Sequence, residues 1–297
     1  MADLKAVRER IKSVGNTQQI TKAMKMVSAA KLRRAQQAIQ QMRPYADKLN
    51  EMLRNILSAL EGGANTTFGT AREVNNACVV VVTSSRGLAG AFNSNIIKAA
   101  VAEIEAYEDV RKNGELTILC IGKKGYEYFS KRYTDCTIIS DYVNQFADLD
   151  FDNVALISKR LMDAFEDGRV DEVKVCYSRF KNAAMQFAEA EQFLPVEQLE
   201  IEEGAEVQKH KADYIFEPSK EELLEKLVPN ILQTSFQAYL LDTHASEHGA
   251  RMTAMDKATE NAQEMLDDLK LTYNKARQEA ITNEILEIVG GAAALEA

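Results

Sequence analysis

Few residues of this 297-residue chain have a type and spacing suited to chemistry. The stretch Thr83–Asn95, TSSRGLAGAFNSN, lies between an expected strand and an expected helix, where phosphate-binding loops occur. Its glycines, Gly87 and Gly90, are spaced G-x-x-G, so it lacks both the GxGxxG fingerprint and the Gly-Lys-Ser/Thr ending of a P-loop. The stretch GKKG, Gly122–Gly125, is an equally weak phosphate cradle. A tight turn that packs against the next helix and exposes Arg86 is the simpler interpretation.

The cysteines and histidines lack the spacing of a metal site. Each cysteine lies in an apolar, strand-like segment without a C-x-x-C partner, which predicts buried reduced thiols at Cys78, Cys120, Cys136 and Cys176. His244 and His248 lie four residues apart on one expected helix face, but two ligands alone do not define a metal site. No Ser-His-Asp or Cys-His set is present either. We therefore expect no metal, no cofactor and no catalytic residue.

Charge is distributed unevenly along the chain. Residues 1–54 hold twelve Lys or Arg against four Asp or Glu, a net charge of +8, whereas the remainder carries −17 of the chain's total of −9. A basic segment on an acidic protein indicates nucleic acid, a membrane surface or an acidic protein partner, or simply a solvated helix face. No apolar run approaches the ~18 residues that a membrane span needs, and the charged start is unlike a signal peptide. We expect a soluble cytoplasmic protein.

Residues 1–60 are expected to form one long helix. From Leu32 to Leu60 apolar residues recur at alternating steps of three and four, which is a heptad pattern, and residues 4–14 have the same spacing. Between Gly15 and Lys31 the seam becomes small and polar, and we expect the register to slip there. Pro44 predicts a kink and not the end of the helix.

A second long helix is expected over residues 218–289, followed by a tail at 290–297. Its heptad seam runs from Ala245 to Ala280. A helix this long with a seam of Ala, Thr, His and Tyr is not stable alone. Because the two long helices flank one compact domain, they are expected to pair as an antiparallel, left-handed coiled coil.

Residues 75–195 change to a strand–helix alternation. Strands are expected at 78–85, 116–122, 136–142 and 171–180, with helices between them. Residues 183–195 are expected to form a fifth strand that pairs with the fourth as a hairpin. This pattern predicts an α/β, Rossmann-like domain with a central, mostly parallel sheet flanked by helices. Residues 196–217 are acidic and are expected to be an irregular connection.

Four blocks of the sequence carry a family resemblance. They are NTQQITKAMKMVSAAKLRRAQ, SSRGLAGAFN, ASEHGARMTAMDKATENA and LTYNKARQEAITNEILEIVGGAAAL. These blocks closely resemble the gamma subunit of F-type ATP synthases, and the match runs in order along the whole chain. The resemblance implies a central-stalk rotor subunit that is not an enzyme by itself. It would couple ion-driven rotation of the membrane c-ring to sequential change at the catalytic beta subunits, and regulate ATPase activity and proton flow.

The resemblance also implies which residues contact partners. Lys22, Met24 and Lys25, in the ITKAM block, and Arg86 are expected to face acidic loops of the beta subunits. Arg277 and Gln278 match a polar pair that engages a loop of one beta subunit. The apolar end of the helix would turn in a sleeve lined by alpha and beta subunits, through Ile281, Ile285, Ile288 and Val289.

The implied partners are the alpha and beta subunits, the epsilon subunit and the c-ring, with no nucleic acid. Membrane association would occur only through the complex, at the cytoplasmic face of the bacterial inner membrane. Plastid relatives carry a two-cysteine regulatory loop, and this chain has no cysteine after Cys176, so we expect no such thiol switch.

Three alternatives stay open on the residues alone. A coiled-coil scaffold predicts a stable homodimer. A nucleotide-dependent enzyme predicts binding that is lost on mutation of Gly87 or Gly90. A nucleic-acid-binding protein predicts steep salt dependence, but residues 1–44 lack the interleaved aromatic residues of a single-strand binder.

Overall fold

The computed structural model describes residues 4–58, 68–69, 72–196 and 219–296. The chain divides into two compact units, one of residues 31–250 and one that combines residues 1–30 with residues 251–297. Two long helices, α1 (Leu4–Ser58) and α6 (Lys220–Glu296), contribute to both units. The first unit is called the α/β unit below, and the second is called the paired-helix unit.

The α/β unit is built on a five-stranded sheet in the order β3-β2-β1-β4-β5. The strands are β1 (Ala77–Val82), β2 (Leu116–Ile121), β3 (Thr137–Ile139), β4 (Glu172–Phe180) and β5 (Gln186–Leu194). All neighbours pair in parallel except β4 and β5, which form an antiparallel hairpin. The α/β fold with a mostly parallel sheet is confirmed, and so is the hairpin. The third strand is shorter than predicted, since β3 has only three residues.

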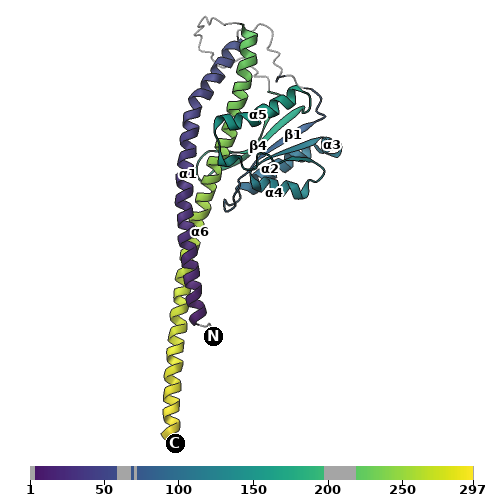
Figure 1. Cartoon of the computed structure of the whole chain (residues 1–297). Coiled ribbons are helices and arrows are strands. Elements are labelled where there is room, and N and C mark those ends of the chain that lie inside the picture. The colour runs from purple at the N-terminus through teal and green to yellow at the C-terminus, as the bar shows by residue number, and fades with distance from the viewer. Residues whose placement is uncertain (1–3, 59–67, 70–71, 197–218, 297) are drawn as a thin grey trace. The chain divides into compact units, whose positions relative to one another are not determined.

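Alternate residues of each central strand face opposite sides of this sheet, as the pleat requires. Cys78, Val80 and Val82 of β1 share a core with α5 (Phe151–Glu166), the first part of α6 and Leu49 of α1. The intervening β1 residues pack with α2 (Phe92–Ala106) and α4 (Lys123–Arg132) on the other side (Figure 1). Two short elements complete this unit, α3 (Glu108–Lys112) and the 3-10 helix η1 (Gln145–Ala147).

Helix α6 also closes the carboxyl end of the sheet. The pairing of β1 with β4 ends at Cys176, so Ser178 on β4 has no neighbour on β1. Its backbone amide donates to Oγ1 of Thr243 over 3.2 Å, and its carbonyl accepts from Oγ of Ser246 over 3.1 Å. All three residues are buried. Two hydroxyls of α6 therefore complete the strand beyond the point where its neighbour stops.

In the paired-helix unit, α1 and α6 run antiparallel. Four side-chain pairs join them, and the two residue numbers of each pair add to 280 or 281. A constant sum is expected when two helices run antiparallel in one register, because one number rises as the other falls. The pairs are Arg8–Tyr273, Gln18–Gln263, Thr21–Thr259 and Lys25–Asp256. This confirms the predicted antiparallel pairing of the terminal helices.

The predicted slip of register between Gly15 and Lys31 is wrong. Gln18, Thr21 and Lys25 face α6, and Ser28 is buried. The steps from Val14 through these residues to Leu32 alternate between four and three, so the heptad spacing is unbroken. The seam changes from apolar to polar at constant spacing.

Both long helices extend through residues that often end helices. α1 continues through Pro44 to Ser58, so the prediction that Pro44 does not end the helix is confirmed. α6 continues to Glu296 and includes residues 290–296, which the sequence set apart as a tail. The predicted irregular connection at 196–217 lies outside the described residues, except for Val196.

Candidate partner-binding surfaces

The GKKG stretch is occupied by the chain itself. The amide of Gly125, in the first turn of α4, donates to Oγ1 of Thr83 over 2.8 Å, and the amide of Lys124 donates to the carbonyl of Ser84 over 3.1 Å. A Cβ on Gly122, where φ is +96°, would lie 1.9 Å from the carbonyl oxygen of Thr83. These glycines therefore serve close packing, and the helix amides that would hold a phosphate are already bonded.

The carboxyl edge of the sheet is occupied in the same way. Doubly wound folds bind ligands outside the ends of their strands, where the strand order reverses. In this sheet that place lies beyond β1 and β4, and Thr243 and Ser246 of α6 are bonded there to Ser178. This arrangement disfavours the alternative of a nucleotide-dependent enzyme.

The turn after β1 is held in a fixed shape. The Ser84 amide donates to Oδ1 of Asn93 over 3.0 Å. The Ser84 hydroxyl donates to the carbonyl oxygen of Arg86 over 2.6 Å, and its oxygen accepts from Nδ2 of Asn93 over 2.8 Å. Ala89 is buried beneath the turn, whereas Arg86 is exposed. The sequence interpretation of a tight turn packed on the next helix agrees with this geometry.

The three expected contacts on α1 differ in their surroundings. Lys22 is exposed and Met24 is half-buried. Lys25 is half-buried and forms an ion pair with Asp256 of α6, so it already joins the two helices. The sequence did not single out Asp256, although it lies in the ASEHGARMTAMDKATENA block, one residue after the seam residue Met255.

Another polar pair joins the helices near the start of α1. Nη2 of Arg8 donates to the hydroxyl of Tyr273 over 2.8 Å, and the guanidinium lies 5.7 Å from the centre of the Tyr273 ring. The hydrogen bond from Arg8 lowers the pKa of Tyr273, and the same bond raises the pKa of Arg8. Polar contacts therefore alternate along the seam with buried apolar side chains such as Val7, Met255 and Leu266.

The last described part of α6 is exposed to solvent. Every side chain from Arg277 to Gly291 is exposed, including Gln278, whereas Tyr273 and Ala276 are half-buried. This part continues beyond the start of α1 (Figure 1). Four expected contact residues are large apolar side chains between 44% and 65% exposed: Ile281, Ile285, Ile288 and Val289. The structure thus places these four apolar side chains close together on an exposed part of α6.

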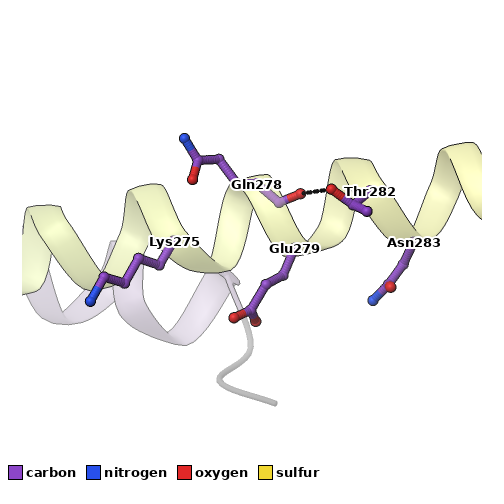
Figure 2. Close-up of a pocket in the computed structure, with 5 residues that line it drawn as sticks. All are labelled: Lys275, Gln278, Glu279, Thr282 and Asn283. Carbon is purple, nitrogen blue, oxygen red and sulfur yellow. Dashed lines mark hydrogen bonds between the residues drawn. The ribbon is translucent and has the colours of Figure 1, made fainter.

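An open polar recess lies on this same stretch of α6. It is lined by Lys275, Gln278, Glu279, Thr282 and Asn283. Figure 2 shows Lys275, Glu279 and Asn283 pointing to one side of the helix and Gln278 pointing to the other. The Thr282 hydroxyl donates to the Gln278 carbonyl over 2.9 Å. Small-molecule sites are usually enclosed and largely apolar. This open, polar recess is therefore better suited to hydrogen bonds with a partner chain.

The four cysteines, His244 and His248 lie in the α/β unit. All four cysteines are free thiols, and three of them are buried as predicted, but Cys136 is half-buried because it precedes the edge strand β3. Nε2 of His244 and Nε2 of His248 lie 3.0 Å apart, and the His244 ring stacks on Phe146. Within the described ranges no group of three or more metal-ligating side chains is found. Among the same residues, none of the helices has the length and apolar character to cross a membrane.

The comparisons with known proteins cover the full chain. A family model described as ATP synthase matches residues 3–295. The ATP synthase gamma chain of Cytophaga hutchinsonii is 54% identical over 299 residues, which cover 99% of each chain. That of Flavobacterium psychrophilum is 51% identical over 296 residues and is matched over its whole length.

The solved structures share the fold at lower identity. A chain in a structure of the Euglena gracilis mitochondrial ATP synthase, comprising OSCP, F1 and the c-ring, has a TM-score of 0.65 at 21% identity and covers 98% of this chain and 94% of its own. A rotor chain of the same organism has a TM-score of 0.60 at 23% identity and covers 94% of this chain and 98% of its own. The sequence relatives carry the assignment: the chain belongs to the family of ATP synthase gamma chains.

Proposed function

We propose that this chain is the central-stalk rotor subunit of an F-type ATP synthase, with no catalytic site of its own. The observation that carries the proposal is the 54% identity to a gamma chain over 99% of both sequences. The antiparallel helices provide the shaft, and the α/β unit provides the body of the subunit.

The shaft acts by unequal contact with the subunits around it. Chemically alike beta sites adopt different affinities for ADP and ATP when an asymmetric shaft meets each of them differently. Rotation driven by ion flow through the c-ring then exchanges these affinities in sequence. A surface of exposed polar and charged groups suits such a shaft, because weak, screened contacts are broken and remade at low cost.

The contacts with the catalytic head fall into two groups. Lys22, Lys25, Met24 and Arg86 face acidic loops of the beta subunits, with Lys22 the more available lysine because Lys25 is paired with Asp256. Arg277 and Gln278 engage a loop of one beta subunit by hydrogen bonds. The second group is the exposed apolar stripe, which turns in an apolar sleeve of alpha and beta subunits: Ile281, Ile285, Ile288 and Val289. Contiguous exposed apolar side chains are typical of interaction sites.

The α/β unit meets the epsilon subunit and the c-ring at the other end of the assembly. The chain is thereby peripheral to the membrane, at its cytoplasmic face. The relatives with the highest identity quoted above are bacterial gamma chains, which supports this location.

Co-purification tests the proposal. Tagged full-length chain, expressed with alpha and beta subunits, should retain a hexameric ATPase at one copy of this chain per hexamer, as counted by native mass spectrometry. The isolated chain should show no ATP hydrolysis. A chain that purifies as a stable homodimer without ATPase subunits would support the scaffold alternative instead.

A further inference from the structure

In the turn after β1, a leucine adopts the left-handed backbone conformation that glycine prefers, while the glycine before it does not. Leu88 has a φ of +61°, in the left-handed region, and within the described residues it is the sole non-glycine residue with a positive φ. Gly87, immediately before it, has no positive φ, and a Cβ there would meet nothing within 4 Å. A side chain would thus fit at position 87 without strain, whereas at position 88 it strains the backbone.

This strain cannot relax, because the residues on both sides are held. The Ser84 hydroxyl lies 2.6 Å from the carbonyl oxygen of Arg86, and the Ser85 hydroxyl donates to the carbonyl of Val143 over 3.4 Å. On the other side Ala89 is buried, and its carbonyl accepts from the amide of Phe92 over 3.3 Å. The turn therefore presents position 88 in one fixed conformation.

Leu88 contributes little to the stability of the isolated chain. The Leu88 side chain is 64% exposed, so it adds little to the core. A local conflict between sequence and backbone that brings no gain within the fold is expected where a function requires it. Presentation on a rigid turn also suits binding, because the side chain needs no further ordering when a partner covers it.

We propose that Leu88 is a docking residue that inserts into an apolar socket of the catalytic head, beside the acidic surface that meets Arg86. The exposed Leu88 calls for an apolar socket, and the positive charge of Arg86, two residues away, would be complemented by carboxylates at its border. This inference rests on the proposed function, since it names a residue by which the rotor meets the head. It assigns the leucine a role separate from that of the neighbouring arginine.

A competition experiment with the full-length chain tests this inference. Equal amounts of wild-type chain and one variant, distinguished by mass, are mixed with limiting alpha and beta subunits, and the recovered ratio is measured by mass spectrometry. Leu88→Ala removes most of the side chain and keeps the strain, whereas Leu88→Gly removes both. Both variants should be recovered at least fivefold less than wild type. Leu156→Ala is the matched control, because Leu156 lies on α5 and is 62% exposed, and it should compete equally.

Melting temperatures of the isolated chains separate docking from folding. Leu88→Ala should melt as wild type does, and Leu88→Gly should melt at the same or a higher temperature, because glycine accepts a positive φ. Equal recovery of Leu88→Ala and wild type would overturn the inference while leaving the proposed function intact. A melting temperature lowered by several degrees in Leu88→Ala would also overturn it. Failure of the wild-type chain to enter the hexamer would instead refute the proposed function.

Discussion

The backbone amide of Ser178 on β4 donates to Oγ1 of Thr243 on α6 over 3.2 Å. Ser246, three residues further along α6, donates to the carbonyl of the same Ser178 over 3.1 Å. Helix α6 thereby binds both backbone polar groups of Ser178. These two bonds fix the rotation of α6 about its axis and its position along the sheet. Within the α/β unit, these two bonds therefore tie α6 to the end of β4.

Removing either hydroxyl should destabilise the α/β unit. Thr243→Val leaves the buried amide of Ser178 without an acceptor, and Ser246→Ala leaves its carbonyl without a donor. Each should lower the free energy of unfolding by about 1–3 kcal/mol, as measured by urea denaturation. Thr272→Val is the control, because the exposed Thr272 hydroxyl bonds only to Asp268 on its own helix, and it should change stability by less than ~0.5 kcal/mol. Equal effects of Thr243→Val and Thr272→Val would contradict the role of this join.

Stability should depend on pH through Asp242. Burial raises the pKa of Asp242 to about 6, against the opposing effects of the Phe180 amide, Arg43 and Arg179, while the charge of Glu191 adds to the increase. A carboxyl group with a raised pKa binds its proton more tightly in the folded than in the unfolded chain. Stability should therefore fall as pH rises from about 4 through 6, and become constant above about 7.

Asp242→Asn tests this pH dependence. The amide cannot ionise, so the variant should be more stable than wild type by about 1–2 kcal/mol at pH 8, and the gain should vanish near pH 4. Urea midpoints measured between pH 4 and 8 give the comparison. Asp267→Asn should act in the opposite direction, because hydrogen bonds from Gln263 and Lys270 lower the pKa of Asp267. A constant difference between Asp242→Asn and wild type across this range would exclude the raised pKa.

Replacement of Lys25 should affect the stability of the chain, whereas replacement of Lys22 should affect its binding to partner subunits. Lys25→Ala breaks the ion pair with Asp256 and should cost the isolated chain roughly 0.5 kcal/mol, since both partners are partly exposed. Lys22→Ala should leave stability unchanged and reduce the salt sensitivity of binding to alpha and beta subunits, because Lys22 is exposed. Binding titrations at 50 and 200 mM salt measure the second effect. If Lys22→Ala binds with the wild-type salt dependence, Lys22 does not face an acidic partner.

Much of the fold was predictable because its signals are local. The strands of the α/β unit are short apolar runs bounded by turns, and apolar runs of this kind are read directly from sequence. The pairing of α1 with α6 was predictable for a different reason, since neither helix has a seam that is stable alone. The one error of register arose because Gln18, Thr21 and Lys25 occupy seam positions with polar side chains, which an apolar pattern cannot detect.

Features that depend on contacts between distant parts of the chain, or on the backbone conformation of a single residue, were not predictable from the sequence. Thr243 and Ser246 resemble ordinary small helix residues until the fold shows that Ser178 has no neighbour on β1. The positive φ of Leu88 was hidden by the adjacent Gly87, which sequence rules would select for that conformation. The expected partner contacts came from family resemblance, and the structure adds their exposure and the pairing of Lys25 with Asp256.

Two glycines, one from each of the two weak phosphate-loop stretches, should respond differently to alanine. In Gly122→Ala, where φ is +96°, the new Cβ would lie 1.9 Å from the Thr83 carbonyl oxygen, so this variant should lose about 3 kcal/mol or more. Gly87→Ala has open space and should stay within ~0.5 kcal/mol of wild type. Urea denaturation measures both, and nucleotide binding by calorimetry should be absent in wild type and in Gly87→Ala. Binding that is lost in Gly87→Ala would revive the enzyme alternative.

The apolar stripe at the end of α6 should matter to assembly and not to the isolated chain. Ile281, Ile285 and Ile288 recur at steps of four and three on an exposed part of α6. Their joint replacement by alanine keeps the helix, since alanine has the highest helix propensity. The unfolding free energy should therefore change by less than ~0.5 kcal/mol, because the removed side chains are exposed.

Assembly of the same triple variant should be much weaker. Each isoleucine that enters an apolar sleeve loses roughly 1–2 kcal/mol of burial on truncation, so competition for limiting alpha and beta subunits should disfavour the variant by more than tenfold. A second triple variant, with Glu279, Glu284 and Glu287 replaced by alanine, changes the same stretch of exposed helix and removes charge instead of apolar surface. It should assemble at least as well as wild type if the sleeve is apolar. The reverse order of the two triple variants would show that acidic and not apolar side chains hold this end of the shaft.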